Sequence, residues 1–126
     1  MQLVGTAVAL GSGTLGNTYH TLVALSTGAL WASGANWDGQ LGNSDTNDVN
    51  LPTRVCADVA CATYFAVDVA GITAGHNVIA RGRNWSTAIK DDGTLWVWGD
   101  DGGSGVFGNG SLDVQSNIPV QVNFTP

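Results

Sequence analysis

The chain has little positive charge and no long apolar segment. Its 126 residues include four basic residues against ten acidic ones, which gives a formal net charge of −6. Nucleic-acid binders need clustered Lys and Arg to neutralise phosphates. Arg81 and Arg83 are the only local basic pair in the sequence, so we expect no binding to nucleic acid. No run approaches the ~18 apolar residues of a membrane span, so we also expect no membrane insertion.

Charged residues of either sign number only 14 (4 + 10), and no stretch has the charge runs or the long amphipathic period of a helical protein. Glycine, in contrast, is abundant. It supplies 18 of the 126 residues, about twice its ordinary share of roughly 7%. Such a composition is expected where many tight turns join short strands. The apolar start, MQLVGTAVALGSG, lacks a basic region, so we predict no signal peptide.

One stretch of the sequence occurs twice. HTLVALSTGALWASGANWDGQLG, residues 20–42, returns in looser form as WSTAIKDDGTLWVWGDDGGSGVFG, residues 85–108. Identical residues at one offset of 65 (93 − 28) are the pairs Gly28 and Gly93, Leu30 and Leu95, Trp31 and Trp96, and Gly34 and Gly99. One added residue then brings Gly42 to Gly108, and another brings Pro52 to Pro119. A long internal period indicates an array of similar structural units.

The repeated unit has the alternation of a β-strand. In GTLWVWG, Leu95 and Val97 alternate with Trp96 and Trp98, and successive side chains of a strand point to opposite faces. In each copy a strand-like run, TLVAL or STAIK, precedes the tryptophan strand, and the sequence Asp-Gly at 92–93 is a strong hairpin signal. We therefore predict an all-β fold of short antiparallel strands. Further strands are expected at 6–10 and 66–73, and near Pro52 and Pro119.

The first copy resembles a known repeat. The run GALWASGANWDGQLG, from Gly28 to Gly42, and the preceding His20-Thr21 are similar to the repeat of the regulator of chromosome condensation family. The second copy keeps the glycines and Trp96 but has Trp85 in place of the His and Asp101 in place of the Asn. The resemblance covers about two repeats, nearly the whole chain. It implies that each repeat forms one four-stranded blade of a β-propeller.

The implied organisation is a single domain, 1–126, made of two blades. We place blade 1 at about 3–55, a connecting insertion at 56–65 and blade 2 at 66–126. Propellers typically need 4 to 8 blades, and an unclosed array leaves faces and strand edges open. We therefore expect part of an incomplete propeller or one completed by oligomerisation. Its partner would be the chain itself or another structural protein.

The two cysteines, Cys56 and Cys61, lie in the insertion between the repeats. They could form a disulfide that closes a small loop, or they could be two separate apolar core residues. A metal site would need further ligands at suitable spacing, and His20 and His76 are isolated in the sequence. We predict no metal and no cofactor.

Two other motifs are better explained as loops. Gly11 to Gly16 matches the GxGxxG pattern of dinucleotide sites, but the residues after it are rich in β-formers where a helix is required. The segment 43–48, NSDTND, spaces oxygen ligands like the start of a calcium loop, yet the expected sixth-position glycine is Asp48 and the expected twelfth-position acid is Arg54. We interpret it as a polar turn, because Asn, Asp and Ser favour turns.

Candidate binding residues lie in the turns that follow the two tryptophan strands: Asn36, Trp37, Asp38, Asp100 and Asp101. Trp37 is the tryptophan expected to be most exposed, because it lies within a turn. An exposed aromatic beside an acid can anchor a sugar or a protein. The alternative is that Trp37 fills the gap between the blades.

Three functions remain open. The chain could be a structural or assembly subunit that makes protein–protein contacts, a lectin-like or adhesive module that binds ligands such as glycans through its loops, or an enzyme. No coherent set of catalytic residues is recognisable, so we expect no catalysis and favour the assembly subunit. An even cysteine count fits an oxidising location. We accordingly favour an extracellular or virion surface over the cytoplasm.

Overall fold

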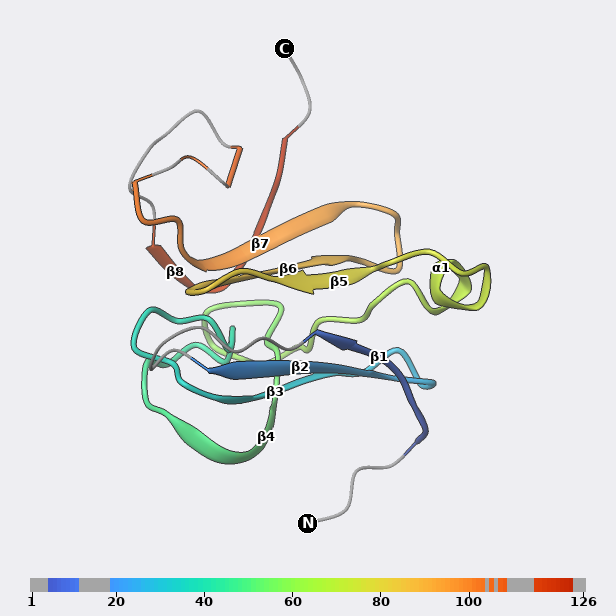
Figure 1. The fold of residues 1–126 in the computed structure, drawn as a ribbon, viewed down its shortest axis with the longest axis horizontal. Helices are drawn as coiled ribbons and strands as arrows, with labels where there is room; N and C mark the ends of the chain where they lie inside the picture. Colours follow the sequence, from blue (N-terminus) through green and yellow to red (C-terminus); the bar gives the residue numbers. More distant parts are fainter. Residues whose placement is uncertain (1–4, 12–18, 104, 106, 109–114, 124–126) are drawn as a thin grey trace.

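The computed structural model describes residues 5–11, 19–103, 105, 107–108 and 115–123, and these form two antiparallel sheets stacked face to face (Figure 1). Each sheet has four strands in sequence order. The strands of blade 1 are β1 (Ala7–Gly11), β2 (His20–Leu25), β3 (Leu30–Gly34) and β4 (Val49–Arg54). Those of blade 2 are β5 (Ile79–Arg81), β6 (Trp85–Ile89), β7 (Leu95–Asp100) and β8 (Gln115–Gln121). The predicted all-β, two-blade fold is confirmed.

The two blades repeat each other in register. His20 pairs with Gly34 in blade 1, as Trp85 pairs with Gly99 in blade 2. The pairing of the third and fourth strands shifts register at the same place in both sheets, between residues 32 and 34 for β3 and β4 and between residues 97 and 99 for β7 and β8. Gly34 and Gly99 have φ of 108° and 98°, and a Cβ there would lie 2.4 and 2.2 Å from a backbone carbonyl oxygen of the preceding strand segment. Only glycine fits, because such a φ is strained for other residues.

The predicted strand at 66–73 is wrong over its second half. Ala66 and Val67 make isolated β-bridges to Ala29 and Lys90, but Val69–Thr73 is the short helix α1. Asp68 caps α1, since its Oδ1 accepts a hydrogen bond from the Gly71 N–H at 3.0 Å. An aspartate cap offers the backbone an alternative to strand pairing. The helix projects from one edge of the stack between the two blades (Figure 1).

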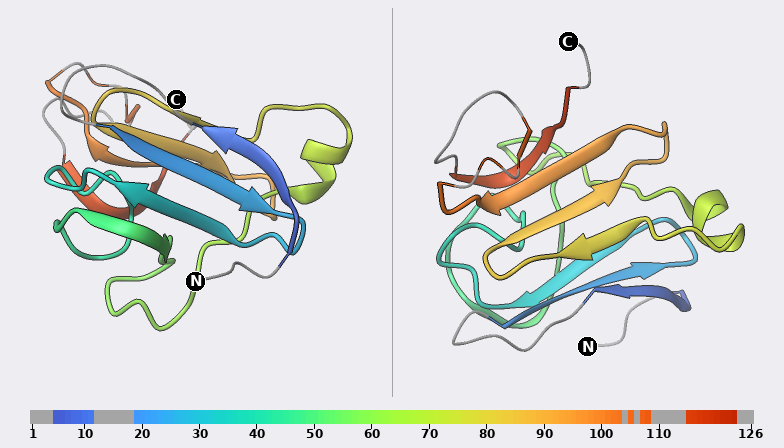
Figure 2. Two further views of the ribbon diagram at one scale, coloured as in Figure 1. Left: turned by 60° about the horizontal axis from the view of Figure 1, so that its bottom comes forward. Right: turned by 45° about the horizontal axis from the view of Figure 1, so that its top comes forward.

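Figure 2 shows the two stacked sheets from two further sides. The main core lies between them. Blade 1 contributes Leu22 and Leu30, and blade 2 contributes Trp98, all 0% exposed. Phe65, from the segment that joins the blades, is 5.8 Å from Trp98 and 6.1 Å from Trp96 between ring centroids. The alternation predicted for β7 is thus observed, because Trp96 and Trp98 face blade 1.

A second, smaller cluster lies on the other face of blade 2. Val97, Phe107 and Val122 are buried there, and Trp85 and Leu95 pack against them half-buried. The outer face of blade 1 carries Trp31, whose ring lies 5.4 Å from the Arg54 guanidinium carbon. Each blade therefore has one face buried against the other blade and one face without a second sheet in the described part of the chain. No helix among the described residues is long and apolar enough to span a membrane.

Candidate functional site

Asn36 organises the loop that follows β3. It is 0% exposed, and its Oδ1 accepts a hydrogen bond from the Leu41 N–H at 3.0 Å. Its Nδ2 donates to Asn43 Oδ1 and to the Asp45 carbonyl, both at 3.0 Å. A fourth bond, from the Asn36 backbone N–H to Asp48 Oδ1, measures 2.8 Å. Asn36, predicted as a binding residue, is thus an internal brace that gives the loop 36–48 its shape.

The polar turn 43–48 uses its oxygens within the loop. Asp45 Oδ1 accepts from the Asn47 N–H at 2.5 Å, and Asp48 accepts from Asn36. No group of three His, Cys, Asp or Glu side chains in the described residues could hold a metal ion. The GxGxxG motif at 11–16 lies almost entirely outside the described residues.

A buried polar network fastens this loop to blade 2. The Gln40 carbonyl oxygen accepts hydrogen bonds from Trp98 Nε1 at 2.9 Å and from Ser86 Oγ at 2.7 Å. Ser86 Oγ also lies 2.9 Å from His20 Nε2. All four residues are at most 2% exposed. Because hydrogen bonds in a dry interior hold a specific geometry, the network fixes the loop relative to the second blade.

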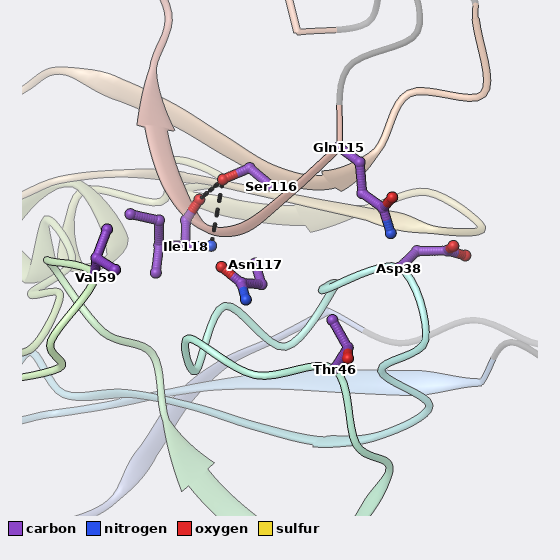
Figure 3. A pocket seen from close by; sticks show the side chains of 7 residues that line it. All are labelled: Asp38, Thr46, Val59, Gln115, Ser116, Asn117 and Ile118. Carbon is purple, nitrogen blue, oxygen red and sulfur yellow. Dashed lines mark hydrogen bonds between the residues drawn. The ribbon is translucent and has the colours of Figure 1, made fainter.

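The fastened loop forms one wall of a pocket of about 460 Å³ (Figure 3). It is lined by Asp38, Thr46, Val59, Gln115, Ser116, Asn117 and Ile118. The last four belong to β8, so the pocket lies between the loop of blade 1 and the outer strand of blade 2. Its volume is within the range usual for small-molecule sites, roughly 300–1,000 Å³.

Direct contacts close the junction between the loop and β8. The Ser44 N–H donates to the Asn117 carbonyl at 2.9 Å, and Gln115 Nε2 donates to the Trp37 carbonyl at 3.4 Å. Gly39 has a φ of 78°, and a Cβ on it would lie 2.6 Å from Asn117 Cα. Glycine is therefore required at residue 39 for the loop to lie this close to β8.

Asp38 lines this pocket, and Trp37 precedes it in the same loop. The Trp37 side chain is 81% exposed, so it does not fill the gap between the blades. Asp38 is half-buried and lines the pocket. Burial raises the pKa of Asp38 above its ordinary value of 3.8, and the negative charge of Asp100 raises it further. A carboxyl group and several amide and hydroxyl groups thus line the pocket, and an exposed indole lies on the residue next to Asp38 in the sequence.

Asp100 and Asp101 lie around a different hollow, of about 260 Å³, together with Arg83, Asn84 and Trp85. Asp100 is half-buried, and its Oδ1 accepts from the Gly102 N–H at 2.9 Å. Asp101 is 2% exposed, and its Oδ1 accepts from the Gly103 N–H at 2.9 Å. Asp101 is the repeat equivalent of Asn36 (36 + 65), and both are buried in their loops.

The predicted residues therefore divide into two groups. Asp38 lies close enough to Asp100 to feel its charge, and Trp37 is the neighbour of Asp38 in the loop. Asn36 and Asp101, in contrast, are buried inside their loops. Sequence reasoning missed the part of the pocket that β8 supplies. The available signal was the pairing of Pro52 with Pro119, which places a strand at 115–121 but does not say which loop it faces.

The loop closed by the disulfide supplies another wall of the pocket between the loop 36–48 and β8. Cys56 and Cys61 are bonded, with Cα atoms 5.0 Å apart. Inside the loop they close, Asp58 accepts from the N–H groups of Ala62 and Thr63 at 3.0 Å. The hydrogen bond from the Thr63 hydroxyl, with those from the backbone, lowers the pKa of Asp58. The exposed Val59 of this loop lines the pocket, and its carbonyl accepts from Ser44 Oγ.

The chain is similar to known proteins in both sequence and fold. A profile of the regulator of chromosome condensation (RCC1) repeat matches residues 27–80. The crystal structure of human WBSCR16 superposes on 99% of this chain with a TM-score of 0.68 and 25% sequence identity, and the match covers 27% of that chain. The chain belongs to the RCC1 repeat family. The superposition, which covers nearly the whole chain, agrees with two stacked blades.

The chain is also similar to several curated proteins. The mouse X-linked retinitis pigmentosa GTPase regulator is 32% identical over 80% of this chain. The Arabidopsis thaliana mitochondrial RCC1 domain-containing protein RUG3 is 31% identical over 84%, and mouse protein RCC2 is 31% identical over 85%. This chain spans 8, 21 and 18% of the three relatives, respectively.

Proposed function

We propose that this protein is a non-catalytic assembly module whose RCC1 blades make protein–protein contacts through their open faces. The observation that carries the proposal is the outer face of blade 2. Leu95, Thr87 and Ile89 are half-buried there, around a hollow of about 100 Å³, with no sheet of the described residues over them. An apolar sheet face that no second layer covers normally marks an interface.

Sedimentation velocity of the full chain across a micromolar concentration range tests the proposal. We expect association, and we expect Leu95→Glu to weaken it by at least about tenfold, because a charge in the core of an interface is costly. Leu51→Glu is the matched control, since Leu51 is already 57% exposed. A soluble, folded wild-type protein that stays monomeric at every concentration would overturn the proposal.

The proposed location is an oxidising one, outside the reducing cytoplasm. The Cys56–Cys61 disulfide supports it, because disulfides persist in such compartments and are rare elsewhere. Thiol titration of the protein taken from its native setting and denatured without reductant checks this. Two free thiols there would contradict it.

A second candidate function is ligand binding at the pocket between the loop 36–48 and β8, next to the exposed Trp37, for which a glycan is the class of ligand that fits best. An exposed indole can stack on a sugar ring, and the lining offers Asp38, Gln115 and Asn117 for hydrogen bonds to hydroxyl groups. Binding to a glycan panel should be lost in Trp37→Ala. Tyr19→Ala, which removes another exposed aromatic (53% exposed) outside the loop 36–48, should bind normally.

A further inference from the structure

The contact between the two blades is asymmetric. Blade 1 meets blade 2 with the face that bears Leu22, Ala24, Leu30, Ala32, Leu41 and Val55, none of them more than 1% exposed. Blade 2 meets blade 1 with the other side of its equivalent sheet, which bears Ala88, Trp96 and Trp98. Two different faces therefore form one interface, and each blade possesses both.

The repeat places a second copy of the blade 1 face on the outside of blade 2. At offsets of 65, 66 and 67 (95 − 30, 107 − 41, 122 − 55) the equivalent residues are Thr87, Ile89, Leu95, Val97, Phe107 and Val122. We name this surface the tail face. In blade 1 the corresponding residues are completely covered. On the tail face Val97, Phe107 and Val122 are buried too, whereas Thr87, Ile89 and Leu95 are half-buried beside an open hollow. The tail face is thus one side of a blade–blade contact whose other side is missing from the described part of the chain.

The outer face of blade 1 has the opposite character. It bears Thr21, Val23 and Trp31, which are half-buried and equivalent to Ser86, Ala88 and Trp96. We name it the head face. Arg54 pairs with Trp31 across β3 and β4, and its guanidinium carbon lies 4.4 Å from the ring centre of the half-exposed Tyr64. The head face therefore carries aromatic rings and a cation at its surface, whereas the half-buried residues of the tail face are Thr87, Ile89 and Leu95.

We propose that two copies of this chain associate head to tail, with the head face of one copy on the tail face of the next. This inference rests on the proposed function and names its partner. The contact would continue the interface that already joins the blades within the chain, and Trp31 would occupy the position that Trp96 has there.

Charge supports the same orientation. The β2–β3 and β6–β7 turns lie at the same end of the stack (Figure 1). The β6–β7 turn carries Asp91 and Asp92, both exposed, and Arg54 pairs with Trp31 near the β2–β3 turn. A copy added in the orientation of blade 2 on blade 1 therefore brings Arg54 to the acidic end of its neighbour. Reversal of the added copy would separate these charges.

A head-to-tail contact uses two different patches, so it can be interrupted on either side. Such heterologous contacts produce rings when the rotation closes and open chains when it does not. A variant that lacks the tail face keeps its head face, and a variant that lacks the head face keeps its tail face. Neither should associate alone, but the two together should form a 1:1 pair that grows no further.

The test uses Leu95→Glu for the tail face and Trp31→Glu for the head face, in the full chain, by sedimentation velocity and native mass spectrometry. We expect each variant to be monomeric alone and the mixture to give only a 1:1 dimer. Circular dichroism confirms the fold of each. Thr87→Glu and Thr21→Glu, which remove no core side chain, replace any variant that fails to fold.

The outcomes separate the inference from the function on which it rests. If the wild type associates but either single variant still forms dimers alone, the contact joins like faces and the head-to-tail inference is overturned, while the proposed function stands. The head-to-tail inference is overturned in the same way if the mixed variants do not pair. If the wild type is monomeric throughout, the proposed function fails and the inference fails with it.

Discussion

Asn36 and Asp101 occupy equivalent positions, and both are buried, but their side chains bind different backbone groups. Asn36 uses donor and acceptor atoms together, so it can hold the Leu41 N–H and the Asp45 carbonyl at once. An ionised Asp only accepts hydrogen bonds, and Asp101 Oδ1 accepts one from the N–H of Gly103. The residue type thus determines which loop shape each blade can have.

Replacement of Asn36 by Ala should therefore destabilise the protein by about 3 kcal/mol, because three side-chain hydrogen bonds of roughly 1 kcal/mol each are lost in a buried site. Urea unfolding measures the effect. Asn47→Ala is the control, since Asn47 is exposed and its hydrogen bond to Asp45 comes from the backbone N–H. A change below about 0.5 kcal/mol in Asn36→Ala would show that the loop is held by other contacts.

Asp38 should make stability depend on pH in the direction opposite to an ordinary paired carboxylate. Burial and the charge of Asp100 raise its folded-state pKa above 3.8, so the folded state holds the proton more tightly than the unfolded state. The free energy of unfolding then falls as the pH rises from about 3.8 through the raised pKa. At neutral pH the charged Asp38 destabilises the folded state.

Asp38→Asn should accordingly raise the melting temperature at pH 7 by a small amount, since the side chain is only half-buried, and have no effect at pH 3. Thermal unfolding at several pH values checks this. Asp91→Asn, in an exposed turn, is the matched control. An Asp38→Asn protein that is less stable than the wild type at pH 7 would contradict the direction of the shift.

The segment 55–65 contains no helix or strand and is held by backbone hydrogen bonds and the disulfide. The Phe65 N–H donates to the Val55 carbonyl at 2.9 Å, and the Cys56 N–H donates to the Gly42 carbonyl at 2.8 Å. The first bond closes the segment on itself and the second joins it to the loop of blade 1, while Phe65 packs against Trp98 of blade 2. The disulfide therefore stabilises a segment that contacts both blades.

The double variant Cys56→Ser, Cys61→Ser should lose about 2 kcal/mol, the loop-closure entropy expected for a loop of about five residues. Urea unfolding with and without reductant measures the loss, and reductant should have no effect on the double variant. Ala60→Ser, at an exposed position in the same loop, controls for the added hydroxyl groups. Equal stability of the oxidised and reduced wild type would refute the prediction.

Some features of the whole molecule could be predicted from the sequence and others could not. The hairpins and their spacing were predictable, because strand alternation and turn residues are local and occur twice. The helix α1 was not, since the capping by Asp68 competes with a strand pattern that continues through Val69. The pocket between 38–46 and 115–118 was also beyond reach, because it depends on how one sheet stacks on the other. Stacking is set by Trp98 and Gln40, which are 58 residues apart.

The two blades should unfold as one unit, because the main core and the polar network both cross between them. Trp98 is the residue on which this depends, and blade 1 has Ser33 at the equivalent position. Trp98→Ser should cost about 4 kcal/mol, as truncations of buried Trp do, and should leave the Gln40 carbonyl with one donor fewer. Calorimetry should then show a broader or split transition in place of a single one. Trp37→Ser, at an 81% exposed site, should leave the wild-type transition within about 0.5 kcal/mol. If Trp98→Ser melted like Trp37→Ser, the blades would be independent units and the stacked core would contribute little to stability.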